Sequence, residues 1–180
     1  ERQNCVMVFL HDGLGSTNSW GSLPLQLASE LGINALLYDR RGYGQSSAFT
    51  FSGNIDYLKD EAMYILPELL DKFNVQFPIF IGHSDGATIA LIFSGIYSHV
   101  KSLVVSIAAH SFVEPITIEG IKVLIDNFND GKLREKLYKQ HLDKTDPLFA
   151  SWTSTWLGKE FATYNIFDYL KSIKSPMLLM

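Results

Sequence analysis

The chain has 180 residues, 47% of them hydrophobic, which is enough to bury a sizeable core in one domain. Its 19 acidic and 15 basic residues give a formal net charge of −4, without a Lys/Arg block or a basic helical face. This balance excludes nucleic acid and anionic membranes as partners and favours a small molecule. The single cysteine, Cys5, excludes an internal disulfide and a Cys-rich metal site.

Strand-like and helix-like segments alternate along the chain. In order, we expect a strand at 5–10, a helix at 20–31 that Gly32 ends, a strand at 33–38, a helix at 55–73 that Pro67 bends, a strand at 78–81, a helix at 85–97, and strands at 102–108 and 176–180. Most of the strand runs lack polar alternation, which is typical of strands covered on both faces. The pattern predicts an α/β fold with a mostly parallel, doubly wound sheet, whose ligands bind beyond the carboxyl ends of the strands.

The segment 112–170 is far longer than one crossover between strands needs. It holds short amphipathic patterns at about 118–128, 131–142, 147–157 and 159–170. We therefore expect a core made of residues 1–111 and 171–180 (an incomplete sheet fold), with residues 112–170 inserted as a helical cap over the strand ends.

The most informative stretch is Gly82-His83-Ser84-Asp85-Gly86, which stands between a buried-strand run and an uncharged helix run. A strand that turns sharply into a helix at Ser84 lifts the hydroxyl out of the sheet and directs the first helical N–H groups at whatever Ser84 attacks. Gly82 and Gly86 suit such a turn because strand and helix crowd together there. The pattern predicts a nucleophile.

Two further Gly-rich loops follow the first two strands, His11-Asp12-Gly13-Leu14-Gly15-Ser16 and Asp39-Arg40-Arg41-Gly42-Tyr43-Gly44-Gln45-Ser46. Together with the Ser84 pentapeptide they resemble the α/β-hydrolase superfamily, specifically its capped bacterial serine hydrolases. The resemblance spans the whole chain. It implies a cofactor-independent enzyme that hydrolyses a small, fairly apolar ester, lactone, amide or activated carbon–carbon bond through an acyl-enzyme.

The resemblance also assigns roles to residues. The backbone N–H groups of Gly13 and Asp85 are expected to form the oxyanion hole, each donor being worth about 3 kcal/mol to the transition state. Asp12 departs from the glycine that is commoner in that loop, and the loop at Asp39 is expected to brace it. The residues expected to line the substrate pocket are His11, Leu14, His83, His110, Trp152 and Trp156.

A serine nucleophile needs a histidine base and a carboxylate that orients it, and this fold supplies them in the order Ser, acid, His. In the family both follow the strand after the cap, whereas the sequence stops at Met180 inside that strand and starts at what resembles the family's third strand. We expect the acid and base to lie outside residues 1–180 and the chain alone to be inactive, with His110 as the one candidate substitute base. Open sheet edges predict aggregation or a homodimer.

The sequence also bears on cellular location and leaves two rival functions open. No apolar run could span a bilayer and no signal-peptide pattern opens the sequence at Glu1, so a cytoplasmic location is the default. One rival is a truncated or non-catalytic relative that binds a ligand under its cap. The other is a dinucleotide-binding domain built on Gly13-x-Gly15 and Asp39, although Asn18 replaces the third glycine of that fingerprint.

Overall fold

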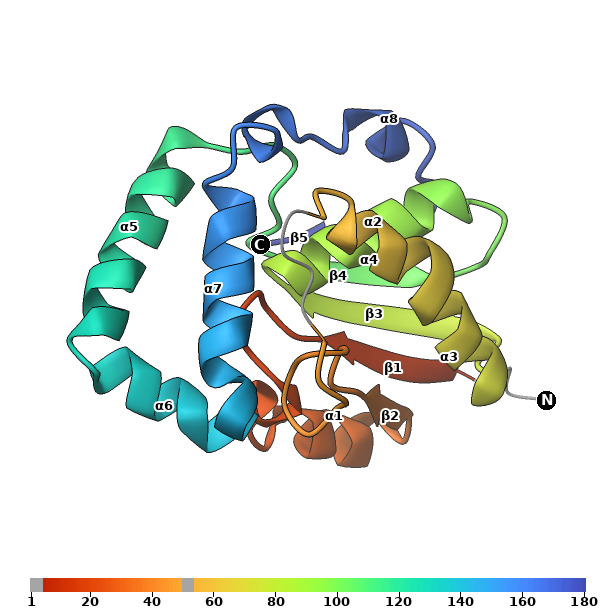
Figure 1. Ribbon diagram of the computed structural model, residues 1–180. Helices are drawn as coiled ribbons and strands as arrows, with labels where there is room; N and C mark the ends of the chain where they lie inside the picture. Colours follow the sequence, from red (N-terminus) through yellow and green to blue (C-terminus); the bar gives the residue numbers. More distant parts are fainter. Residues whose placement is uncertain (1–4, 50–53) are drawn as a thin grey trace.

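A five-stranded parallel sheet forms the centre of the computed structural model, which describes residues 5–49 and 54–180 (Figure 1). Residues 1–4 and 50–53 of the predicted core lie outside the described ranges. The strand order is β2-β1-β3-β4-β5, and every pairing is parallel. The predicted strands are confirmed, with bounds β1 Cys5–Leu10, β2 Asn34–Leu37, β3 Phe77–His83, β4 Leu103–Ile107 and β5 Met177–Leu179.

Alternating side chains of β1 divide the core into two layers. Val6, Val8 and Leu10 pack in the larger layer, and Met7 and Phe9 pack in the smaller one. The larger layer is covered by α2, α3 and α4, and the smaller by α1, so both faces of the sheet carry helices as predicted. The bounds of these helices are α1 Leu23–Leu31, α2 Tyr57–Asp60, α3 Leu66–Lys72 and α4 Asp85–Ile96.

The helix predicted at 55–73 is continuous but changes its winding before Pro67. A π-helical turn, Glu61–Ile65, joins α2 to α3. Proline has no N–H for the carbonyl four residues earlier, that of Met63. The hydroxyl of Tyr97, the residue that follows α4, donates to this carbonyl at 2.8 Å, so the freed acceptor is satisfied. The first predicted helix also ends as expected, because Gly32 adopts a left-handed conformation with φ 64°.

The strand order places a crevice between β1 and β3. The chain runs from β1 to β2 on one side and returns to β3 on the other, so the loops after β1 and β3 diverge. Ligands of open α/β sheets bind at this switch point, beyond the carboxyl ends of the strands.

Residues 112–165 leave the sheet and return to it at neighbouring points. Phe112 pairs with Asn165 in an isolated antiparallel bridge, and the Ile166 N–H donates to the Ser111 carbonyl at 2.9 Å. Between these points three helices stand beyond the arrowheads of the strands in Figure 1. We call this segment the helical insert; its helices are α5 Pro115–Asn129, α6 Lys132–His141 and α7 Thr145–Trp156.

The prediction of a single helix at 159–170 is wrong. That stretch forms a 3₁₀ turn, Phe161–Thr163, and a separate short helix, α8 Phe167–Leu170. Buried Phe161 and Ile166 anchor the irregular chain to the larger core layer, and this tertiary packing outweighs the amphipathic pattern. Gly95 of α4 lies so close to the Tyr169 carbonyl that a Cβ would collide with it, so α8 packs closely on α4.

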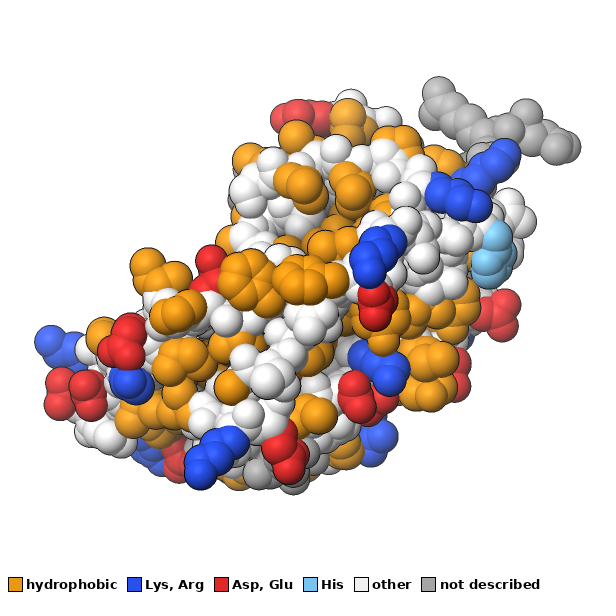
Figure 2. Space-filling view, turned by 90° about the horizontal axis from the view of Figure 1, so that it is seen from above, with side chains coloured by type: hydrophobic (Ala, Val, Ile, Leu, Met, Phe, Trp, Pro, Cys, Tyr) orange, Lys and Arg blue, Asp and Glu red, His pale blue; other side chains and the backbone are white. Residues whose placement is uncertain are grey.

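The face seen from above in Figure 2 mixes acidic and basic side chains, with hydrophobic ones between them. Among the described residues on this face, the two signs of charge alternate and neither dominates. Within residues 5–49 and 54–180, no helix combines the length and the apolar character of a membrane span.

Candidate active site

Ser84 occupies a sharp turn between β3 and α4, as the motif predicts. Its φ of 52° and ψ of −117° lie in a region that a residue with a Cβ rarely adopts. Two hydrogen bonds hold the turn: the Ser84 N–H donates to the Ile107 carbonyl at 2.9 Å, and the Thr88 N–H donates to the Ser84 carbonyl at 3.0 Å. Strain at one residue persists because the flanking strand and helix fix the backbone on both sides.

The two glycines around Ser84 are needed for close packing. A Cβ on Gly82 would lie 2.5 Å from the Gly86 carbonyl oxygen and 2.6 Å from the Ala87 nitrogen. A Cβ on Gly86 would collide with the carbonyl oxygen of Leu10 at the end of β1. Because the obstructing atoms are backbone, they have little room to move. The start of α4 is therefore held against the loop that follows β1.

A cavity of about 230 Å³ opens beside Ser84 at the predicted crevice. Ser84 is half-buried, and its neighbour His83 is exposed. Five of the predicted site residues meet Ser84 here, and Asp12 and Ala108 complete the lining: Asp12, Gly13, Leu14, His83, Ala108, His110 and Trp152. Asp85 is buried, and its N–H begins α4; like the N–H of Gly13, it takes no partner among the described residues.

His11 and Trp156, which we expected in the pocket, lie elsewhere. His11 is 2% exposed and packs against the Tyr43 ring, where its Nε2 accepts the Arg40 backbone N–H at 3.2 Å. Burial, and then the charge of Arg40, hold the pKa of His11 well below its ordinary value. Trp156 is buried and its ring packs edge-on to the ring of His110. Both residues support the wall of the cavity from behind.

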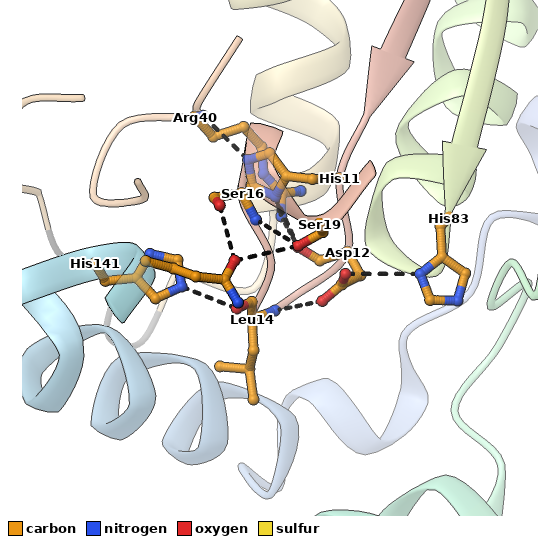
Figure 3. Close-up of polar contacts among 9 residues, drawn as sticks. His11, Asp12, Leu14, Ser16, Ser19, Arg40, His83 and His141 are labelled. Atoms are coloured by element: carbon orange, nitrogen blue, oxygen red, sulfur yellow. Dashed lines mark hydrogen bonds and ion pairs between the residues drawn. The ribbon is translucent and has the colours of Figure 1, made fainter. Parts of the chain in front are cut away.

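The structure gives a reason for Asp12 where glycine is commoner. The Asp12 carboxylate accepts the Leu14 N–H at 3.0 Å and closes a local turn around Gly13. Its other oxygen lies 3.7 Å from Nδ1 of His83 (Figure 3). The side chain thus shapes the loop that carries Gly13 and also places a carboxylate at the rim of the cavity.

The loop after β2 braces this same loop, as expected. Arg40 is buried and donates to the Asp12 carbonyl oxygen at 2.6 Å. The Asp39 carboxylate accepts the backbone N–H groups of Thr17 at 2.7 Å and Gln45 at 2.8 Å. Both Asp39 oxygens therefore accept bonds from the backbone of the chain itself. The dinucleotide interpretation does not fit the structure, because the segment after Gly13-x-Gly15 forms a 3₁₀ turn, Thr17–Trp20, instead of opening an α-helix directly.

A buried polar chain behind the cavity was not foreseen. The Trp156 Nε1–H donates to the Tyr57 hydroxyl at 2.9 Å, and this hydroxyl donates to the Asp85 carboxylate at 2.7 Å. Burial raises the pKa of Asp85, while the charge of Arg40 and the bond from Tyr57 act in the opposite direction. The chain links the helical insert to the residue that follows Ser84. Its members are far apart in sequence, so no local pattern signals it.

We expect Tyr57→Phe to lower the free energy of unfolding by about 2 kcal/mol, because it leaves a carboxylate oxygen and an indole N–H buried without their partner. Tyr64→Phe is the matched control, because Tyr64 is 57% exposed and should change stability by less than about 0.5 kcal/mol. Chemical denaturation of both variants measures the difference. Equal stability of the two would show that the Tyr57 hydroxyl contributes nothing.

His110 lies between the cavity and the core. Its backbone N–H donates to the Thr88 hydroxyl at 3.0 Å, and that hydroxyl donates to the His110 backbone carbonyl at 3.2 Å. The backbone of this cavity residue is therefore fixed to α4.

Among residues 5–49 and 54–180, no His, Cys, Asp and Glu side chains gather in a group of three that could hold a metal ion.

Comparison with known proteins agrees with this architecture. Residues 6–165 match the family model described as alpha/beta hydrolase fold. A proline iminopeptidase of Saccharolobus solfataricus is 31% identical over 129 residues, which cover 71% of this chain and 40% of that protein. The chain therefore spans well under two thirds of that relative's length.

Two solved structures show the same fold. NosK from Streptomyces actuosus superposes with a TM-score of 0.68 at 18% identity, covering 97% of this chain and 74% of NosK. The enol-lactonase from Burkholderia xenovorans LB400 superposes with a TM-score of 0.67 at 16% identity, covering 97% and 71%. With the parallel sheet and the family match, these findings show that the chain belongs to the α/β-hydrolase fold family.

Proposed function

We propose that this chain carries the nucleophile of a serine hydrolase that acts on a small, fairly apolar acyl compound. The observation that carries the proposal is the backbone of Ser84, held at φ 52° between β3 and α4 at the edge of a cavity. A pocket that only binds a ligand has no need of a hydroxyl on a strained turn. In this role the helical insert is a cap over the cavity.

The reaction would proceed by acyl transfer. The Ser84 Oγ attacks the carbonyl carbon of the substrate while a base removes its proton, and the carbonyl oxygen becomes negatively charged. The N–H groups of Gly13 and Asp85 stabilise that oxygen. Collapse of the tetrahedral intermediate breaks the bond to the leaving group, which takes up the proton. Water then attacks the carbonyl carbon of the acyl-enzyme while the base removes a proton from it. Collapse of this second intermediate releases the acid, and the Ser84 oxygen takes the proton back.

The base and acid are proposed to lie outside residues 1–180. No histidine among the described residues forms a hydrogen bond with the Ser84 hydroxyl. His11 and His141 are buried with both ring nitrogens engaged, and His99 is exposed beyond the other end of α4. His83 adjoins Ser84 on a turn where neighbouring side chains diverge. His110 remains the substitute candidate because it shares the cavity.

The size and lining of the cavity support a small substrate. About 230 Å³, walled in part by Leu14, Ala108 and Trp152, suits a compact acyl group. The relatives named as a proline iminopeptidase and an enol-lactonase support an amide or a lactone as well as a simple ester.

A fluorophosphonate probe and a substrate panel test the proposal on the full-length protein. We expect the probe to add to Ser84, located by peptide mass spectrometry, and we expect hydrolysis of at least one p-nitrophenyl ester, γ-lactone or aminoacyl amide. A small ligand that binds in the cavity without any labelling of Ser84 would favour the rival function, a non-catalytic relative that binds under the cap. Turnover by residues 1–180 alone would place the base within the chain, with His110 tested first.

A further inference from the structure

His141, at the end of α6, joins the helical insert to two loops of the sheet. Its side chain is fully buried. The Nδ1 atom accepts the Gly44 N–H at 2.9 Å. Nε2 lies 2.9 Å from the Leu14 carbonyl oxygen, a contact drawn in Figure 3. Because Nδ1 accepts a hydrogen bond, the ring proton is on Nε2 and is donated to Leu14. The two contacts together require a neutral imidazole.

Neighbours of His141 make further bonds to the same two loops. The Gln140 side-chain oxygen accepts the hydroxyls of Ser16 at 2.8 Å and Ser19 at 3.3 Å. The Lys144 ammonium donates to the Ser46 carbonyl at 2.9 Å. The end of α6 and the 3₁₀ turn after it, Leu142–Lys144, thus form a polar clamp, made of Gln140, His141 and Lys144, on the loops that follow β1 and β2.

The clamp acts on the residue next to Gly13. On one side of Gly13, Arg40 donates to the Asp12 carbonyl and so fixes that peptide. On the other side, the Leu14 N–H is held by the Asp12 carboxylate and the Leu14 carbonyl is held by His141. The direction of the Gly13 N–H is therefore set from both sides, and one of the two supports comes from the helical insert.

We propose that His141 is a positioning residue for the Gly13 N–H: its neutral ring holds the loop in the geometry that stabilises the oxyanion, and a proton on Nδ1 releases it. This inference rests on the proposed function. A protonated Nδ1 would direct an N–H at the Gly44 N–H, so two donors would face each other and that contact would be lost. His141 does not touch the substrate cavity and acts only through Leu14 and Gly44.

The surroundings of His141 favour the neutral form. Burial lowers the pKa of His141, the bond to Leu14 and the charges of Asp39 and Asp12 oppose this, and Lys144 lowers it further. The Tyr43 ring lies edge-on to the His141 ring with centroids 6.0 Å apart, and buried His11 packs against this same Tyr43 ring. Since folding lowers the pKa of His141, its contribution to stability is complete above about pH 6.5, the ordinary value, and is lost as pH falls through the lowered pKa.

Three variants of the full-length protein test the role. His141→Phe removes both contacts; His141→Gln keeps a neutral donor and acceptor that cannot titrate; His99→Gln is a control at an exposed histidine. The readouts are kcat and KM for an ester substrate and the hydrogen-exchange protection of the Gly44 amide, each from about pH 8 down to about pH 5. Gly44 protection does not depend on catalysis.

We expect His141→Phe to lower kcat about 10- to 100-fold with KM nearly unchanged, because a small displacement of a donor affects mainly the transition state. In the wild type, Gly44 protection should fall as pH falls, whereas His141→Gln should keep both the neutral-pH kcat and the protection. A folded His141→Phe variant with wild-type kcat overturns the positioning role and leaves the proposed function standing. Unchanged acid loss of Gly44 protection in His141→Gln overturns it as well, whether or not the Phe variant folds. Wild-type protein without hydrolysis overturns both proposals.

Discussion

Ser84→Ala should abolish labelling by a fluorophosphonate and lower kcat by about 10⁴-fold or more, because loss of a nucleophile removes the covalent route. The fold should survive, since Ser84 is half-buried and the bonds that hold the turn involve only its backbone. Activity assays and intact-mass analysis of the labelled protein measure the first effect, and thermal denaturation measures the second. Labelling that persists in the variant would remove Ser84 from its proposed role.

A second substitution at the same position separates catalysis from strain. Ser84→Gly is equally unable to attack, yet glycine adopts a φ of 52° without the steric cost that Ser and Ala share. We expect the Gly variant to be about 1 kcal/mol more stable than the Ala variant, after the greater flexibility of its unfolded chain is taken into account. Equal melting temperatures would indicate that the turn is not strained.

Gly86→Ala should lower the free energy of unfolding by about 3 kcal/mol or more, because the added methyl group meets the Leu10 carbonyl at the end of β1. Denaturant unfolding measures the loss. Gly120→Ala in α5 is the matched control, since a Cβ there meets nothing within 4 Å. It should stabilise the protein by about 0.5–1 kcal/mol through helix propensity. Similar effects of the two substitutions would refute the close approach of α4 to β1.

The sequence predicts the sheet well because its strands are short apolar runs that alternate with helices. Strand identity and class follow from this local pattern, and the position of Ser84 follows from the two flanking glycines, whose spacing reflects the crowding at Gly82 and Gly86. Pro67 likewise predicts an irregularity in its own helix, which has a π-helical turn just before it. Such features depend on residues that are close together in the chain.

The remaining parts depend on contacts between distant residues. The 159–170 stretch has an amphipathic pattern, but Phe161 and Ile166 bury themselves in an irregular chain instead. We expected His11 to line the cavity because it belongs to the first Gly-rich loop. Its ring is instead buried, and its Nε2 accepts the Arg40 backbone N–H. Sequence reasoning also missed the Tyr57 chain and the His141 clamp. The one available signal was a histidine at the end of a helix with polar neighbours, which is common on surfaces.

Residues 112–165 depart and return through the pairing of Phe112 with Asn165, so both ends of the helical insert meet the sheet at one place. We expect that another helical segment could be exchanged for the insert at this one junction, with the parallel strands left intact. In the proposed role of the insert as a cap, such an exchange would change which molecules reach the cavity. The exchanged segment must also offer an acceptor to the Gly44 N–H and a donor to the Leu14 carbonyl. Without these two contacts, we expect kcat to fall even though the Ser84 turn itself is unchanged. His141 is therefore one of several contacts that limit such an exchange, together with Gln140, Lys144 and Trp156.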